Sequence, residues 1–140
     1  NVGGKDRVNY TILGDSVNLA SRLEGLTKKY GVSILVTEAT RALVHDEAIV
    51  FRLLDEITVA GKAVPTKLYQ AFWKESIDTN IVHDYEEALD YYRKGEWDEA
   101  EIRFQSLEER KDKPSAIMRA RIAELRTKAS WDGVWRFDEK

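Results

Sequence analysis

The stretch YTILGDSVNLASRLE, residues 10–24, changes its pattern in the middle. Residues 6–13 alternate apolar and polar side chains, which predicts a strand. Gly14 permits a tight turn, and Asp15 is suited to cap the helix that follows. Over residues 19–30 an apolar side chain recurs every three or four positions, which predicts an amphipathic helix. The stretch is therefore predicted to fold as a strand, a turn and a helix packed by one face.

Two polar side chains, Asn18 and Arg22, lie close to the apolar stripe of this predicted helix. Because they are four residues apart, they point in a similar direction. Arginine is permanently charged and can bind phosphate oxygens with two parallel hydrogen bonds, while asparagine carries a donor and an acceptor on a short stem. Spacing alone favours ordinary structural roles, namely a local backbone contact for Asn18 and a surface ion pair for Arg22.

The composition is that of a folded globular protein and excludes several kinds of site. The chain has 140 residues, of which 43% are hydrophobic and 34% charged, and its net charge is -3. This balance gives no support to nucleic-acid binding. There is no cysteine, which excludes disulfides and thiolate metal sites, and no apolar run long enough to span a membrane. These features fit a cytoplasmic location.

The first 75 residues give an α+β pattern. Residues 32–37 are predicted to form a short buried strand, and residues 37–44 a short helix that begins with a threonine cap. Residues 48–59 and 66–73 alternate again and are predicted to pair as antiparallel strands. The two histidines are isolated in the sequence and are interpreted as surface or packing residues.

Residues 76–140 are more acidic, and from residue 83 the apolar residues recur with a helical period. Helices are predicted over 83–95, 96–110 and 115–129. The small and aromatic residues of the first two resemble a tetratricopeptide helical hairpin, but only about one and a half repeats fit. Because such a repeat needs a neighbour to bury its face, we expect this tail to pack on the first unit or on another chain. Trp131 and Trp135 are expected to anchor its C-terminal end.

The run RVNYTILGDSVNLASRLE, residues 7–24, resembles the second half of a class III nucleotidyl cyclase catalytic domain. The resemblance extends from residue 1 to about residue 72. It implies that residues 1–75 are the C-terminal half of a ferredoxin-like catalytic domain and that residues 76–140 are a helical tail. It also implies a parent enzyme that converts a nucleoside triphosphate into a 3′,5′-cyclic monophosphate and pyrophosphate, and a fragment that is inactive alone.

The resemblance assigns roles to four residues. Asn18 matches the position that orients the ribose, and Arg22 the position that stabilises the transition state. Thr11 matches the position that reads the purine, and threonine there is typical of bacterial adenylate cyclases, which favours ATP over GTP. Lys62 lies in a loop that resembles the family's V-K-G-K, where a lysine reaches the triphosphate. This loop has Ala60 in place of the first lysine, so a solvated hairpin lysine is the favoured interpretation of Lys62 and contact with the triphosphate the alternative.

The resemblance also implies groups that this chain does not supply. The family binds two divalent cations, Mg²⁺ or Mn²⁺, through two aspartates that precede the matched region, so no metal ligand is predicted here. It acts as a head-to-tail homodimer, often attached to an upstream sensor that can be membrane-anchored. Two alternatives remain open: a non-catalytic dimerisation or protein-interaction module, and a guanylate cyclase.

Overall fold

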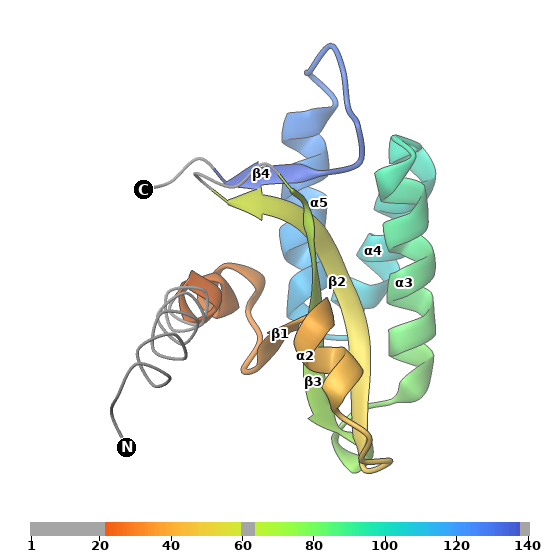
Figure 1. Cartoon of the computed structure of the whole chain (residues 1–140). Coiled ribbons are helices and arrows are strands. Elements are labelled where there is room, and N and C mark those ends of the chain that lie inside the picture. The colour runs from red at the N-terminus through yellow and green to blue at the C-terminus, as the bar shows by residue number, and fades with distance from the viewer. Residues whose placement is uncertain (1–21, 60–63, 138–140) are drawn as a thin grey trace, which may run out of the picture.

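A four-stranded sheet with the strand order β1-β3-β2-β4 forms the centre of the computed structural model (Figure 1). The structure describes residues 22–59 and 64–137. The two long strands, β2 (Ile49–Val59) and β3 (Thr66–Trp73), pair antiparallel, as their alternating patterns predict. The outer strands are short. β1 (Leu35–Thr37) pairs antiparallel with β3, and β4 (Trp135–Phe137) pairs parallel with β2.

A β-bulge in β2 changes which of its side chains face the helices. Leu53 pairs with Tyr69 and Asp55 pairs with Leu68, so Leu54 is an extra residue on this strand. Because side chains alternate along a strand, one extra residue reverses the alternation beyond it. Leu54 and Asp55 are both completely buried as a result. The bulge therefore brings a carboxylate to the helix-covered face of the sheet.

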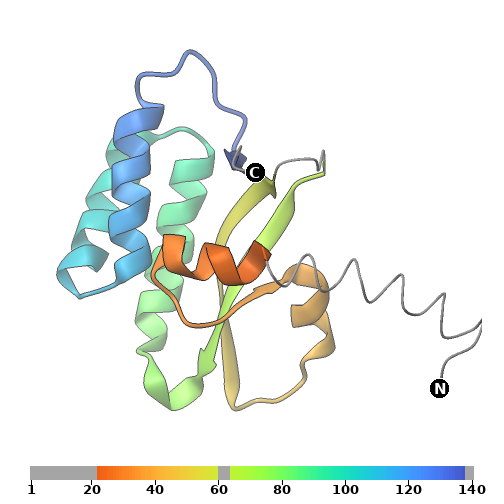
Figure 2. The ribbon, with the colours of Figure 1, turned by 90° about the vertical axis from the view of Figure 1, so that its left-hand side faces the viewer.

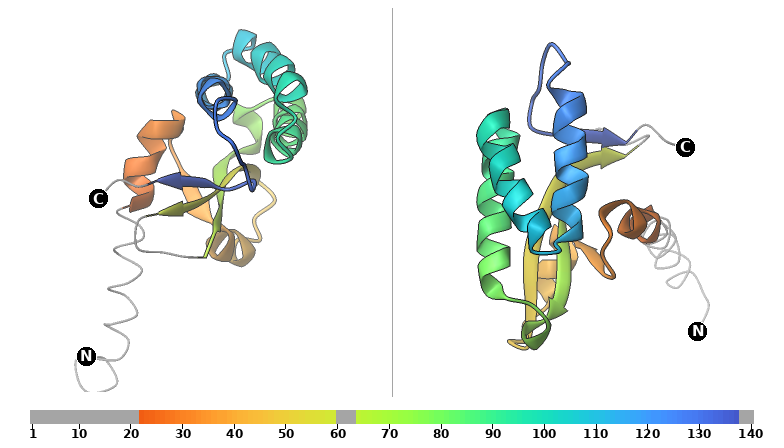
Figure 3. Two further views of the ribbon diagram at one scale, coloured as in Figure 1. Left: turned by 90° about the horizontal axis from the view of Figure 1, so that it is seen from above. Right: turned by 180° about the vertical axis from the view of Figure 1, so that it is seen from behind.

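One short helix, α2 (Glu38–Leu43), lies on the opposite face of the sheet from the later helices (Figure 3). It begins as predicted, with the side chain of Thr37 accepting a hydrogen bond at the N-cap. The guanidinium of Arg41 stacks over the rings of Phe51 and Tyr69, at 5.5 and 5.0 Å from their centroids. These contacts tie α2 to the two central strands.

Three helices follow the 3-10 turn η1 (Lys74–Ser76), and their bounds are α3 (Thr79–Arg93), α4 (Trp97–Glu109) and α5 (Lys113–Leu125). All three lie on one face of the sheet (Figures 1 and 3). α4 folds back along α3 after Gly95, whose φ of +79° few other residues adopt without strain. The predicted helices are thus present, joined by short turns.

The small and aromatic residues of α3 and α4 face one another. Ala88, Tyr92, Ala100 and Phe104 are all completely buried. Phe104 meets Tyr85 edge-on, with ring centroids 5.3 Å apart. The alanines let the two helices approach closely, and the aromatic rings fill the space beside them. The resemblance to a tetratricopeptide repeat stays a prediction.

The helix that begins the described part of the chain covers residues 22–30 and lies beside α5 (Figures 2 and 3). Its buried side chains are Leu26 and Tyr30. Gly31 ends it with a φ of +70°, and a Cβ placed there would lie 3.0 Å from the Cβ of Lys113. The helix therefore ends in close contact with the first turn of α5.

A single hydrophobic core extends from the sheet into the tail. Its fully or nearly fully buried members come from helix 22–30, from the strands and from α3 to α5. They include Leu26, Tyr30, Leu54, Ile57, Leu68, Tyr85, Leu89, Tyr92, Phe104, Met118 and Ile122. The tail thus packs on the first unit, which was one of its two predicted arrangements. The division into domains at residue 75 stays a prediction.

Some element boundaries differ from those predicted, and one strand was not predicted. The strand predicted over 32–37 begins only at Leu35. The first tail helix begins at Thr79, because the side chain of Asp78 caps it there. β4 was not predicted as a strand, since three residues carry no periodic signal and depend on pairing with β2 for their conformation.

We predict that Phe104→Ala destabilises the fold far more than Ile102→Ala. The Phe104 ring is completely buried against two tyrosines, so its removal should lower the free energy of unfolding by about 3–5 kcal/mol. Ile102 lies on the same helix but is 63% exposed, and its truncation should cost less than about 0.5 kcal/mol. Urea unfolding followed by circular dichroism measures both. Equal losses would contradict the placement of α4.

Candidate functional site

Of the four residues predicted to contact a nucleotide, Arg22 belongs to the part of the chain that the structure describes. Asn18, Thr11 and Lys62 lie outside the described residues, so their roles stay predictions. Arg22 begins the described helix and is exposed. The structure therefore gives the position of one of the four predicted residues, Arg22.

Arg22 lies on the same side of its helix as the buried residues that follow it. Leu26 and Tyr30 are four and eight positions later, which places all three along one stripe. Leu26 is 6% exposed and Tyr30 is completely buried, whereas Arg22 is exposed. The helix is thus held by its C-terminal half and emerges from the core toward its N-terminal half.

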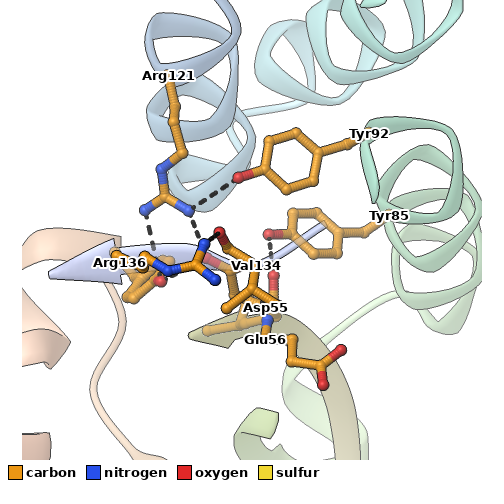
Figure 4. Close-up of polar contacts among 9 residues, drawn as sticks. Asp55, Glu56, Tyr85, Tyr92, Arg121, Val134 and Arg136 are labelled. Carbon is orange, nitrogen blue, oxygen red and sulfur yellow. Dashed lines mark hydrogen bonds and ion pairs between the residues drawn. The ribbon is translucent and has the colours of Figure 1, made fainter. Parts of the chain in front are cut away.

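A buried polar network holds the C-terminal end of this helix (Figure 4). The Tyr30 hydroxyl donates a hydrogen bond of 2.6 Å to the Asp55 carboxylate at the bulge of β2. Arg121 of α5 forms an ion pair with the same carboxylate oxygen. The Arg121 guanidinium also donates to the Tyr92 hydroxyl at 3.3 Å and to the Tyr30 hydroxyl at 3.4 Å. One carboxylate therefore joins the helix, the sheet and the tail.

Aromatic rings surround the guanidinium of Arg121. Its central carbon lies 4.3 Å from the ring centroid of Trp135, 5.4 Å from that of Tyr30 and 5.8 Å from that of Phe137. Two of these rings belong to β4, so the last strand closes the network as well as the sheet. Arginine suits such a position, because its flat cation can stack on rings while it donates hydrogen bonds in its plane.

Burial changes the proton affinities in this network. It raises the pKa of Tyr30, Tyr85 and Tyr92 well above their ordinary value of 10.0, and the nearby Asp55 charge raises them further. Burial alone would lower the pKa of Arg121, but Asp55 and the adjacent tyrosines raise it well above its usual value. The network is thus an ionised pair surrounded by neutral hydroxyls at neutral pH.

A second buried ion pair joins the sheet to the tail near the other end of α5. The Arg52 guanidinium, 2% exposed, donates to Asp112 at 2.8 Å and to the side-chain oxygen of Gln70. Ser115 donates to the other oxygen of Asp112 at 2.6 Å. The Arg52 cation also stacks on Tyr85, 4.7 Å from its ring centroid. Two separate charge pairs thus fix α5 against the sheet.

Sequence reasoning missed Asp55 and Arg121, although the pattern holds a signal for each. The residue order Leu53, Leu54, Asp55 interrupts the alternation of a strand, which is typical of a bulge. Arg121 lies three positions after Met118 and next to Ile122, both completely buried, so it belongs to the apolar face of α5. A charged residue on such a face indicates a buried partner.

The described residues offer no fit to a metal centre. Within residues 22–59 and 64–137 there is no group of three or more histidine, aspartate or glutamate side chains placed to hold a metal ion. His45 and His83 are both exposed.

Among the described helices, none is long and apolar enough to cross a bilayer.

Comparison with known proteins identifies the first part of the chain. The profile of the adenylate and guanylate cyclase catalytic domain matches residues 1–75, more than half of the sequence. The chain belongs to this family. The matched residues include the helix that carries Arg22 and the strands β1 to β3, and the mixed α+β fold with its four-stranded sheet agrees with a cyclase catalytic domain. No solved structure matches.

Three relatives carry the name adenylate cyclase. A terminal-differentiation specific adenylate cyclase of Dictyostelium discoideum is 35% identical over 125 residues, which cover 83% of this chain and 6% of that protein. An adenylate cyclase of Anabaena cylindrica is 45% identical over 71 residues, 49% of this chain and 14% of that protein. Adenylate cyclase 1 of Rhizobium meliloti (strain 1021) is 42% identical over 69 residues, 49% of this chain and 10% of that protein. The chain spans a small part of each.

We predict that this cyclase fold loses stability as the pH rises above 10. Below pH 10 the three buried tyrosines are neutral in both the folded and unfolded states. Above it they ionise more readily when unfolded, because their pKa is raised in the fold. The free energy of unfolding should then fall by up to about 1.4 kcal/mol per pH unit for each tyrosine.

Urea titrations at about pH 9 and about pH 11 measure this loss, and tyrosinate absorbance reports the ionisation. The Tyr92→Phe variant should lose about one third less stability over the same interval, because one of the three titrating groups is gone. A free energy of unfolding that is unchanged between the two pH values would show that the tyrosines are not buried as described.

Proposed function

We propose that this chain is part of an adenylate cyclase that converts ATP to 3′,5′-cyclic AMP and pyrophosphate in signal transduction, and that residues 1–75 are the C-terminal half of its catalytic domain. The observation that carries the proposal is the family match over residues 1–75, together with three relatives that are all named adenylate cyclase. In this reaction the ribose 3′-oxygen forms a bond to the α-phosphorus and loses its proton. The bond from that phosphorus to the oxygen of pyrophosphate breaks.

The proposed roles follow the charge that this reaction develops. Arg22 stabilises the negative charge on the transferring phosphoryl group, because a guanidinium matches phosphate oxygens in shape and charge. Asn18 orients the ribose, Thr11 contacts the purine, and Lys62 approaches the triphosphate. The exposure of Arg22 supports this assignment, since a residue that must reach a substrate cannot be enclosed by its own core.

The complete site requires groups from elsewhere. We propose that two divalent cations, Mg²⁺ or Mn²⁺, bind to aspartates outside this chain, since the described residues do not fit a metal centre. We propose a homodimer in which this chain supplies the half of the site with Arg22. The chain alone should then be inactive, and the parent protein should act in the cytoplasm, joined to an upstream sensor.

Two other functions remain as alternatives. The chain could serve in a pseudo-cyclase, as a dimerisation or protein-interaction module, which the absence of both metal-binding aspartates from the parent sequence would indicate. A guanylate cyclase is the other, because the single hydroxyl of Thr11 discriminates weakly between purines. Competition between ATP and GTP in one assay, with both cyclic products measured, separates the two cyclases.

We predict that Arg22→Ala in the full-length protein lowers kcat for cyclic AMP formation by more than about 100-fold, with a smaller effect on KM. A contact that strengthens in the transition state affects turnover more than binding. Lys28→Ala is the matched control, because Lys28 is an exposed cation of the same helix with no proposed role. Cyclic AMP is measured with ATP and Mg²⁺ or Mn²⁺.

Two results would count against this proposal. A full-length protein that makes no cyclic nucleotide, under conditions where a known cyclase is active, would refute the enzymatic function. An Arg22→Ala variant that loses only ATP affinity would refute the role in the transition state. Equal effects of Arg22→Ala and Lys28→Ala would indicate that Arg22 contributes only through general surface charge.

A further inference from the structure

Part of the support of the helix over residues 22–30 comes from the tail. Arg121 of α5 contacts the Tyr30 hydroxyl, and the ring of Phe137 in β4 meets the Tyr30 ring edge-on at 6.3 Å. The Lys29 ammonium lies 5.7 Å from the centroid of the Phe137 ring. Each of these partners lies beyond residue 75, where the match to the cyclase family ends. A helix inside the family region is therefore fixed in part by residues outside it.

The hydrogen bonds at Tyr30 fix the rotation of this helix as well as its depth. Apolar packing of a side chain tolerates small rotations, whereas a hydroxyl held at 2.6 Å from a buried carboxylate does not. Asp55 cannot follow such a rotation, because the amide of Glu56 donates to its other oxygen at 2.8 Å and Arg121 holds the oxygen that Tyr30 also contacts. The end of the helix is thus fixed to a rigid point of the sheet.

The orientation of Tyr30 determines where Arg22 points. The two residues lie about two turns apart on the same side of one helix. A side chain extends about 5–6 Å from the helix axis, so a rotation of about 10° displaces its tip by about 1 Å. A displacement of about 1 Å can cost about 100-fold in rate when a group must meet a transition state.

We infer that the helical tail acts as a positioning element for catalysis, with Arg121 and Tyr30 as its positioning residues. Through the chain of contacts from Arg121 to Asp55 to Tyr30, the tail sets the rotation of the helix that carries Arg22. This inference rests on the proposed cyclase function for its effect on turnover. The mechanical link itself is independent of that function and can be measured separately.

The decisive comparison is Tyr30→Phe against Tyr85→Phe in the full-length protein. Both tyrosines are completely buried, and each variant removes one hydroxyl and the hydrogen bond that it donates, of 2.6 and 2.8 Å respectively. Tyr30→Phe also removes the longer bond of 3.4 Å that Arg121 donates to this hydroxyl. Tyr85 lies on α3 and donates to the backbone of Leu54, so it makes no bond to the helix over 22–30. The pair therefore matches chemistry and burial while differing in the element that is released.

We predict that Tyr30→Phe lowers kcat about tenfold and changes KM for ATP less than about twofold. Hydrogen exchange of the amides over residues 22–30 should become about five- to tenfold faster, because a net hydrogen bond contributes about 1 kcal/mol. Tyr85→Phe should leave kcat within about twofold and leave exchange in this peptide unchanged. Urea unfolding of both variants checks that their losses of stability are comparable.

Each outcome decides a separate point. Unchanged exchange in Tyr30→Phe would refute the link, and faster exchange with unchanged kcat would refute the positioning role. Equal kinetic losses in both variants would assign the effect to general stability. If the unmodified protein makes no cyclic nucleotide, the proposed function fails, while faster exchange in Tyr30→Phe alone would still establish that this contact fixes the helix.

A second pair of variants tests the contribution of the tail to this link, which Arg121 makes. Arg121→Lys keeps the charge beside Asp55 but loses the planar group that contacts Tyr30, Tyr92 and the ring of Trp135. Arg119→Lys is its control, because Arg119 lies on the same helix and its partners among the described residues belong to the tail, namely Glu108 at 2.6 Å and Glu101 at 3.9 Å. Arg121→Lys should reproduce the kinetic and exchange effects of Tyr30→Phe, and Arg119→Lys should reproduce neither. Equal behaviour of the two lysine variants would overturn the role of the tail.

Discussion

The carboxylate of Asp55 is completely buried, and three parts of the chain meet around it. A buried ion without partners costs several kcal/mol, and here Tyr30, Arg121 and the amide of Glu56 supply the partners of this carboxylate. Loss of one partner of a buried ion pair typically costs about 3–5 kcal/mol, against a total stability of about 5–15 kcal/mol for a domain. Helix 22–30, the sheet and α5 are therefore interdependent.

The bulge at Leu54 makes this arrangement possible. The tail also covers the edge of β2, the strand that contains the bulge. Without the extra residue, Asp55 would face α2 on the other side of the sheet. β4 covers the outer edge of β2 only from Ile57 onward. Before that point α3 takes over, because Glu86 accepts from the amide of Leu53 at 2.8 Å and Tyr85 donates to the carbonyl of Leu54 at 2.8 Å. The edge is thereby satisfied without a further strand.

The local features of this fold could be predicted from the sequence, and the long-range ones could not. The antiparallel strands, the Thr37 cap and the three tail helices follow from periodicity and capping, which depend on neighbouring residues. The pair formed by Asp55 and Arg121 joins residues 66 positions apart, and no local pattern specifies which carboxylate meets which guanidinium. β4 is equally dependent on a distant partner.

For the candidate site, the sequence predicts which residues contact the nucleotide. The structure shows what holds the helix of one of them, Arg22. The motif singles out Arg22 through its resemblance to a family, but it does not indicate what fixes the helix on which Arg22 lies. That support comes from Tyr30 and from the tail, which the spacing of the motif cannot reveal. The roles of Asn18, Thr11 and Lys62 stay predictions, since they lie outside the described residues.

The match to the family profile ends at residue 75, and the packing of the chain continues across that point. Separate domains usually meet where few contacts cross, yet here two buried ion pairs and a continuous core cross it. The match to the Dictyostelium relative covers 83% of the chain, more than the family profile does, so that relative resembles part of the tail as well. Buried ion pairs add little net stability over apolar packing, but they permit few alternative registers. A tail fixed in this way determines the placement of the helix that carries Arg22, and any displacement of α5 must move that helix or break the contacts of Asp55.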